Sequence, residues 1–122
     1  MTKKHRCAVL CIGNDPIHLN LRCSLLKEQD WSVLTASSGY EGVIRFSQES
    51  VDAVVLDLNG DGSESALITA ELKRLRPGIP VIQVFEGKNL SEGATAQADA
   101  VVAKSEESRI LVKTLRTLLR AS

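Results

Sequence analysis

The sequence has no net charge and no long hydrophobic run. Its 15 basic and 15 acidic residues cancel, so the formal net charge of the 122-residue chain is zero. A dedicated nucleic-acid-binding or membrane-surface protein is expected to carry excess positive charge. No apolar segment approaches the roughly 20 residues that span a bilayer, and the N-terminus lacks a signal-peptide core. We therefore expect a cytoplasmic protein that binds neither nucleic acid nor membrane.

Cysteine is also scarce, with Cys7, Cys11 and Cys23 the three in the chain. On one extended strand, Cys7 and Cys11 would stand about 13 Å apart at about 3.3 Å per residue, which is too far for a disulfide bond. No CxxC or CxH spacing indicates a metal site. We expect all three cysteines to be reduced residues that contribute to packing.

What the sequence does contain is an alternation of short apolar runs with segments of helical spacing. This alternation is typical of βαβ units around a parallel sheet. At 13.2 kDa the chain has the size of one domain. We predict a single domain over residues 1–122, of the α/β class, with a three-layer, doubly wound, five-stranded parallel sheet. The expected strands are residues 8–12, 33–36, 53–56, 80–85 and 100–103.

The first helix has a clear start signal. Asp15 followed by Pro16 is typical of an N-cap and a first helical residue. Ile17, Leu21 and Leu25 then follow at a spacing of four, which places them on one apolar face of the helix.

Three further helices and one weak segment follow. Helices are expected over residues 40–48, around residues 68–75 and after Ser105, which is predicted to cap the last helix. The buried face of that last helix is predicted to carry Leu111, Leu115 and Leu118. Between residues 86 and 98 the pattern is weak and contains two glycines, so any helix there is short or loose.

The residues that leave the strand ends are candidates for a binding site. In a doubly wound sheet, ligands bind beyond the carboxyl ends of the strands. Asp57 follows the third strand and Lys104 follows the fifth. We expect this acid and this lysine to face a common crevice.

Four segments occur in a recognisable order: VLCIGNDP, VDAVVLDL, PVIQVF and ADAVVAK. In this order and at these spacings they resemble a response-regulator receiver domain of two-component signalling, over nearly all of the chain. The resemblance implies a flavodoxin-like fold and a role in phosphorelay signal transduction. It makes Asp57 the phosphoacceptor position and Lys104 the residue that contacts the phosphoryl group. The only catalysis it implies is self-catalysed phosphotransfer to Asp57, so we do not expect an enzyme.

The positions that bind Mg²⁺ in this family differ here. The family has two acids after its first strand, where this chain has Gly13 and Asn14. Mg²⁺ requires near-octahedral oxygen ligands, usually including carboxylates. The remaining candidates for a weak or absent magnesium site are Asp57, Asn14, Asp15 and the carbonyl of Asn59. The role of helix N-cap fits Asp15 better than that of metal ligand.

Two switch positions also differ. Phe85 stands where the family has a hydroxyl that hydrogen-bonds the phosphoryl group, and Val101 stands at the position of the aromatic switch residue. The sequence leaves open whether Phe85 points into the crevice or into the core. We hypothesise that Phe85 permanently fills the space that the mobile aromatic would visit, which disables or locks the switch.

The loop after the lysine departs from the family as well. Ser105 follows Lys104 where the family usually has a proline in a cis peptide. Because a non-proline cis bond costs about 2.5–4 kcal/mol, we expect a trans bond here.

Two functions are compatible with these residues. The first is a pseudo-receiver that acts as a phosphorylation-independent protein-binding module. The second is a conventional receiver that is phosphorylated on Asp57 and has a weakened magnesium site. In either case the partner is another signalling protein, a histidine kinase or a downstream effector, and the oligomeric state is not indicated. We expect the partner surface to be an exposed hydrophobic area around residues 86–98.

Overall fold

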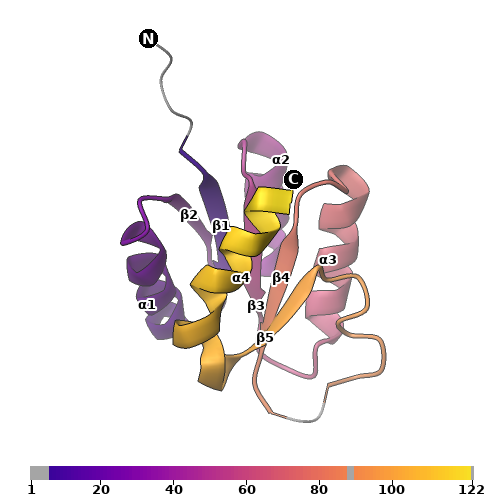
Figure 1. Cartoon of the computed structure of the whole chain (residues 1–122). Helices are drawn as coiled ribbons and strands as arrows, with labels where there is room; N and C mark the ends of the chain where they lie inside the picture. Colours follow the sequence, from indigo (N-terminus) through magenta and orange to yellow (C-terminus); the bar gives the residue numbers. More distant parts are fainter. Residues whose placement is uncertain (1–5, 88–89, 122) are drawn as a thin grey trace.

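A computed structural model describes residues 6–87 and 90–121. Its five parallel strands form one sheet in the order β2-β1-β3-β4-β5 (Figure 1). This is the strand order of the flavodoxin-like doubly wound fold. The predicted fold class is therefore confirmed. The strands are β1 (Ala8–Gly13), β2 (Ser32–Ala36), β3 (Ala53–Asp57), β4 (Val81–Phe85) and β5 (Ala100–Ala103).

Helices cover both faces of the sheet, which gives three layers (Figure 1). The helices are α1 (Pro16–Lys27), α2 (Gly39–Gln48), α3 (Ser63–Leu75) and α4 (Glu107–Ala121), with a 3₁₀ turn η1 (Lys104–Glu106) before the last. Leucines of α1 and α4 form one hydrophobic core with the sheet, and Phe46 of α2 and Leu72 of α3 form the other. β3 is buried along its whole length, as its continuous apolar run predicts.

The packed face of α1 is not the one that the apolar spacing marked. Ile17 and Leu21 are 70% and 65% exposed, whereas the buried residues of α1 are Leu19, Arg22 and Leu26. A spacing of four identifies residues that share a face but not the direction of that face. The packed face could not be recognised from apolar spacing, because Arg22 stands between its two leucines.

Between β4 and β5, the residues that the structure describes (86–87 and 90–99) form turns and no helix. Gly87 and Gly93 have φ angles of 84° and 77°, in the left-handed region that interrupts a right-handed helix. The exposed large hydrophobic side chains of the described residues lie on α1, α2, α3 and β5. The expectation of an exposed hydrophobic surface around residues 86–98 is therefore wrong for the part of this segment that is described.

The last helix begins later than predicted. Ser105 lies inside η1, and α4 begins at Glu107. Leu111 and Leu115 are fully buried, as the spacing predicted. The described residues contain no cis peptide bond, so the bond between Lys104 and Ser105 is trans, as expected.

All three cysteines are free thiols, as expected from the sequence. Cys11 is buried in the core of β1, α1 and α4, and the other two are half-buried.

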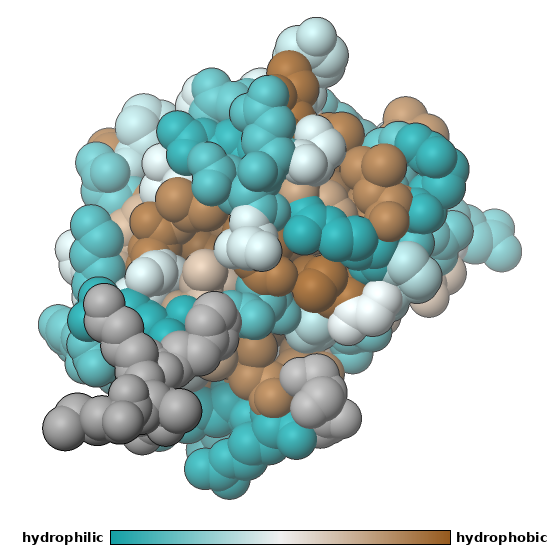
Figure 2. All heavy atoms as spheres, turned by 90° about the horizontal axis from the view of Figure 1, so that it is seen from above, coloured by the Kyte–Doolittle hydropathy of each residue, from teal (hydrophilic) through white to brown (hydrophobic). Residues whose placement is uncertain are grey.

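The surface combines polar and apolar groups. From above, hydrophobic side chains lie interspersed with hydrophilic ones, and no single apolar patch covers this end of the molecule (Figure 2). Within residues 6–87 and 90–121, no helix combines the length and the apolar character that a membrane span requires.

Gly42 gives a prediction about how α2 packs on β1. A Cβ atom on residue 42 would lie 2.4 Å from Cδ1 and 2.8 Å from Cγ1 of Ile12, which is fully buried. In a helix, alanine is favoured over glycine by about 1 kcal/mol, but overpacking a core costs about 1–3 kcal/mol. Since Ile12 is β-branched and stiff, we expect the clash to dominate. Gly42→Ala should lower the free energy of unfolding by about 1–2 kcal/mol, measured by urea denaturation.

Gly78→Ala is the matched control for this prediction. No heavy atom lies within 4 Å of a Cβ placed on residue 78. Its effect should stay within about 0.5 kcal/mol. Equal effects of the two substitutions would show that α2 and β1 are not in close contact at Gly42.

Candidate functional site

Four strands bring their carboxyl ends to one edge of the sheet. Gly13 at the end of β1 pairs in register with Asp57 at the end of β3. Phe85 at the end of β4 pairs with Ala103, and Lys104 follows directly. The parallel sheet thus gathers residues that are 91 positions apart (13 to 104) at one edge. Asp57 is only 4% exposed there.

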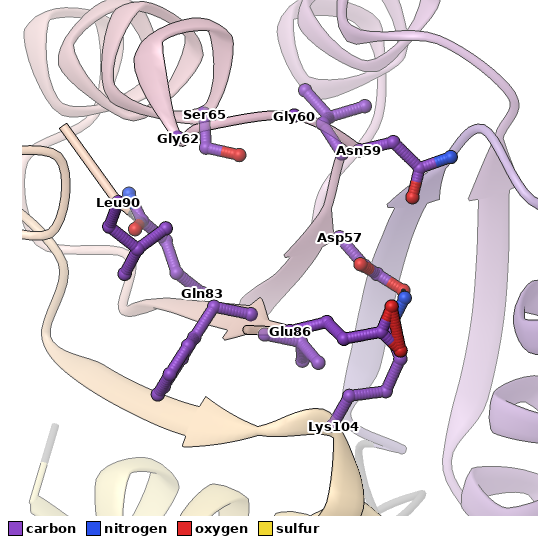
Figure 3. Close-up of a pocket in the computed structure, with 12 residues that line it drawn as sticks. Asp57, Asn59, Gly60, Gly62, Ser65, Gln83, Glu86, Leu90 and Lys104 are labelled. Carbon is purple, nitrogen blue, oxygen red and sulfur yellow. Dashed lines mark ion pairs between the residues drawn. The ribbon is translucent and has the colours of Figure 1, made fainter. Parts of the chain in front are cut away.

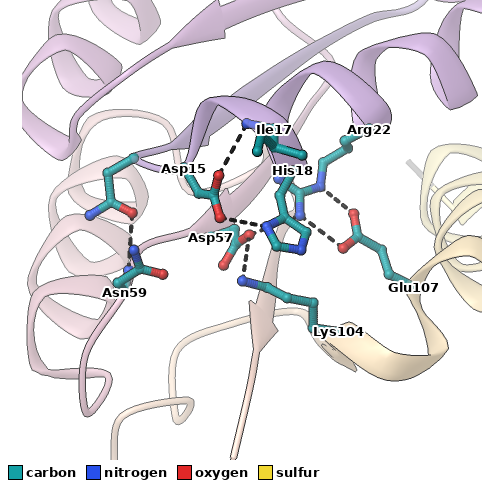
Figure 4. Close-up of polar contacts among 9 residues, drawn as sticks. Asp15, Ile17, His18, Arg22, Asp57, Asn59, Lys104 and Glu107 are labelled. Carbon is teal, nitrogen blue, oxygen red and sulfur yellow. Dashed lines mark hydrogen bonds and ion pairs between the residues drawn. The ribbon is translucent and has the colours of Figure 1, made fainter.

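Asp57 lies between two cations. Nζ of Lys104 is 3.2 Å from Oδ2 of Asp57, so the structure brings together the acid and the lysine singled out from the sequence. Nη2 of Arg22 donates a hydrogen bond to the same oxygen at 2.9 Å (Figure 4). The three side chains are at most 10% exposed, and charge attraction is stronger away from water. The protein itself therefore neutralises the negative charge of Asp57.

Glu107, the first residue of α4, holds Arg22 from the other side. Oε1 of Glu107 accepts a hydrogen bond from Nη2 of Arg22 at 2.8 Å, and Oε2 accepts one from Nε (Figure 4). A bidentate contact of this kind fixes both the position and the orientation of a guanidinium group. Arg22 thereby links α1 to β3 and to α4. Its Nη1 is buried and has no hydrogen-bond partner among the described residues.

The surroundings of Arg22 keep it charged. Burial by itself would lower the pKa of the guanidinium, because it disfavours the charged form. The hydrogen bonds and charge attraction of Glu107, followed by those of Asp57, outweigh burial and raise the pKa of Arg22 above its ordinary value. Arg22 is therefore a permanent cation of the site.

Sequence reasoning missed both Arg22 and Glu107 as site residues. Arg22 stands three residues after Leu19 and four before Leu26, in the register of the packed face. An arginine at the spacing of the buried leucines could have indicated a buried ion pair, since charged residues are rarely buried without a partner. Its partner could not be found in the same way, because Glu107 is 85 residues away and an acid in the first turn of a helix is ordinary.

Asp15 acts as the N-cap of α1. Its Oδ1 accepts a hydrogen bond from the backbone N–H of Ile17 at 3.0 Å, and its Oδ2 lies 2.6 Å from Nδ1 of His18 (Figure 4). The hydrogen bond with His18 is the main reason that the pKa of the Asp15 carboxyl is lowered. Both oxygens of Asp15 are thus engaged at the start of the helix, and not with the aspartate of β3.

The remaining magnesium candidates do not form a cation site. Oδ1 of Asn14 accepts a hydrogen bond from the backbone N–H of Asn59 at 3.2 Å (Figure 4). Gly13 offers no side chain, and Asp57 is already paired with two cations. Throughout residues 6–87 and 90–121, no three His, Cys, Asp or Glu side chains lie together so that they could hold a metal. This set of ligands does not fit Mg²⁺, which needs several free oxygens.

A cavity of about 280 Å³ opens beside Asp57. Asp57 and Lys104 lie on one side of it, and Ser65 and Leu90 lie on the other (Figure 3). Phe85 is half-buried, lines this cavity and belongs to neither hydrophobic core. Of the two alternatives left open by the sequence, the structure therefore excludes a place in either core and puts Phe85 in the wall of the crevice.

Val101 lies apart from this cavity. It is 41% exposed on the edge strand β5 and is not among the residues that line the space beside Asp57. The idea that Phe85 replaces a mobile aromatic side chain stays a prediction.

Solved structures share this arrangement of strands and helices. The CheY-like response regulator receiver domain protein from Methanospirillum hungatei JF-1 matches with a TM-score of 0.86 and 22% sequence identity, over 96% of each chain. The chain has the fold of a response-regulator receiver domain. The resemblance predicted from the sequence is confirmed. The chain also matches the response regulator TrrA from Thermotoga maritima, solved in complex with Mg²⁺-BeF, with a TM-score of 0.79 and 22% identity over 92% of this chain and 98% of TrrA.

Sequence comparison finds a regulatory protein as a relative. The chain is 32% identical over 93 residues to the transcriptional regulatory protein GlrR of Escherichia coli (strain K12). The match covers 76% of this chain and 21% of GlrR, so the chain spans about a fifth of the length of this relative. No family model matches the chain.

Proposed function

We propose that this receiver domain is an atypical one, which acts as a phosphorylation-independent protein-binding module with another signalling protein as its partner. The observation that carries the proposal is the pairing of Asp57 with both Arg22 and Lys104 at the buried strand edge. Receiver domains are signalling modules, and here the state of the module is set by its partner, a histidine kinase or a downstream effector. The domain transfers no group to another molecule.

The charge arrangement opposes phosphorylation of Asp57. Phosphoryl transfer depends on a positioned nucleophile and on neutralisation of the charge on the transferred group. Here Oδ2 of Asp57 is hydrogen-bonded to Arg22 at 2.9 Å and lies 3.2 Å from Nζ of Lys104, which makes the carboxylate a weaker nucleophile. Both cations are already occupied by carboxylates, so they are less available to an incoming phosphoryl group. The neighbouring positions, Gly13 and Asn14, add no negative oxygen to recruit a metal.

One observation favours the alternative, a conventional receiver that is phosphorylated on Asp57 and uses a weakened magnesium site. The cavity of about 280 Å³ beside Asp57 has Lys104 in its wall. Such a space next to a carboxylate is what a small phosphodonor would need. On this alternative the only chemistry is self-catalysed phosphotransfer to Asp57.

A mass measurement tests the proposal. We expect that wild-type protein incubated with Mg²⁺ and a small acyl phosphate gains no mass, because Asp57 is paired and the metal ligands are missing. Asp57→Asn serves as the blank, and a receiver domain known to accept the phosphoryl group under the same conditions serves as the positive control. A gain of one phosphoryl group by the wild type, absent from Asp57→Asn, would overturn the proposal and establish the alternative.

A further inference from the structure

We propose that the Arg22 guanidinium is a resident cation that takes the place of a divalent metal in this domain. In this view, the arginine and its holder Glu107 exclude the metal even when the missing acids are restored. The inference rests on the proposed function, since it concerns the same site, but it names a residue pair that no motif of the sequence pointed to.

The geometry places Arg22 between the positions that would supply metal ligands. Nη2 of Arg22 donates to Asp57 at 2.9 Å. A Cβ atom built on Gly13 would lie 3.7 Å from Nη1 of the same guanidinium. The group therefore faces both the acid of β3 and the first position after the apolar run of β1. Mg²⁺ would need oxygens from these positions at about 2.0–2.1 Å, in the space that the guanidinium already occupies.

Nη1 of Arg22 would attract an aspartate introduced at position 13. Nη1 of Arg22 is buried and has no hydrogen-bond partner among the described residues. A buried donor without a partner is costly, so a nearby carboxylate would be drawn to it. An aspartate at position 13 would extend from a Cβ only 3.7 Å away. It would pair with Arg22 and would not be free to bind a metal.

The charges of the site already balance. Arg22 and Lys104 carry two positive charges, and Asp57 and Glu107 carry two negative charges, all within one connected set of contacts. In the wild type, a divalent cation placed in this set would add two uncompensated positive charges at short range, where charge repulsion is strong. Glu107 contributes to this exclusion because its bidentate contact holds the guanidinium of Arg22 in place.

Four proteins test the inference: the wild type, the acid pair Gly13→Asp with Asn14→Asp, the neutral pair Arg22→Met with Glu107→Gln, and the combination of all four substitutions. The neutral pair removes one positive and one negative charge, so the balance of the site is unchanged. The probe is Mn²⁺ alone, and the free ion is quantified by its electron paramagnetic resonance signal. We expect the combined variant to bind Mn²⁺ about 100-fold or more tightly than the acid pair does. Equal affinities of the acid pair and the combined variant would overturn the inference.

A second measurement does not depend on how well the combined variant folds. With Arg22 in place, the acid pair should have a higher Tm than the wild type even in a chelator, because the carboxylate introduced by Gly13→Asp would satisfy Nη1. Adding Mg²⁺ should leave that Tm unchanged. A Tm that rises with Mg²⁺ would show that a metal binds beside the arginine, and the inference would be wrong. Phosphorylation of the wild type would overturn the proposed function but not this result.

Discussion

Arg22→Ala is expected to lower the free energy of unfolding by about 3–5 kcal/mol, the usual cost of removing one partner from a buried ion pair. The substitution leaves Glu107 buried without its partner and removes one of the two cations beside Asp57. It also cuts the only described side-chain ion pairs that connect α1 with α4 and with β3. Urea denaturation followed by circular dichroism measures the loss.

Two controls separate the buried network from ordinary packing. Arg109→Ala removes an exposed arginine that pairs with Glu106, with side chains 75% and 41% exposed, and should cost less than about 1 kcal/mol. Arg22→Met with Glu107→Gln removes both charges and should cost clearly less than Arg22→Ala, since no unpaired charge remains. If Arg22→Ala and Arg109→Ala lost equal stability, the network would not be buried in the folded protein.

The fold was predictable because each of its elements carries a local signal. Residues 53–56 of β3 are apolar without interruption, which indicates a strand covered on both faces, and every one of them is buried. The strand at residues 100–103 was located to the residue, since an apolar run there is bounded by a charge at each end. Gly87 and Gly93 led us to expect at most a short or loose helix between β4 and β5, and the described residues of this segment form turns.

The site was predictable only where topology alone places a residue. Asp57 and Lys104 follow strands, and the carboxyl ends of parallel strands meet at one edge, so their proximity follows from the sheet. Arg22 reaches the same edge from inside a helix. Its place depends on which face of α1 packs, and the exposed Ile17 and Leu21 suggested the wrong face. Arg22 was therefore not predicted as a site residue, because the wrong face of α1 was predicted to be buried.

Asp57→Asn is expected to lower the free energy of unfolding by about 1–3 kcal/mol, and the sign of the effect is informative. In a site built from clustered acids, removing one negative charge relieves repulsion and stabilises the fold. Here the neighbours of Asp57 are Arg22 and Lys104, so removal of its charge leaves Lys104 without its buried partner. The amide oxygen still accepts a hydrogen bond, which keeps the loss below that of Arg22→Ala.

Asp30→Asn is the matched control for this last prediction, because it makes the same chemical change at a surface pair. Asp30 lies 3.4 Å from Arg6, its side chain is 88% exposed, and its φ of 65° is a conformation that asparagine tolerates. Its effect on stability should stay within about 0.5 kcal/mol. If Asp57→Asn proved stabilising while Asp30→Asn stayed neutral, the site would behave as a cluster of acids. The two cations would then not neutralise Asp57, and nothing in the charge balance of the site would keep a metal out.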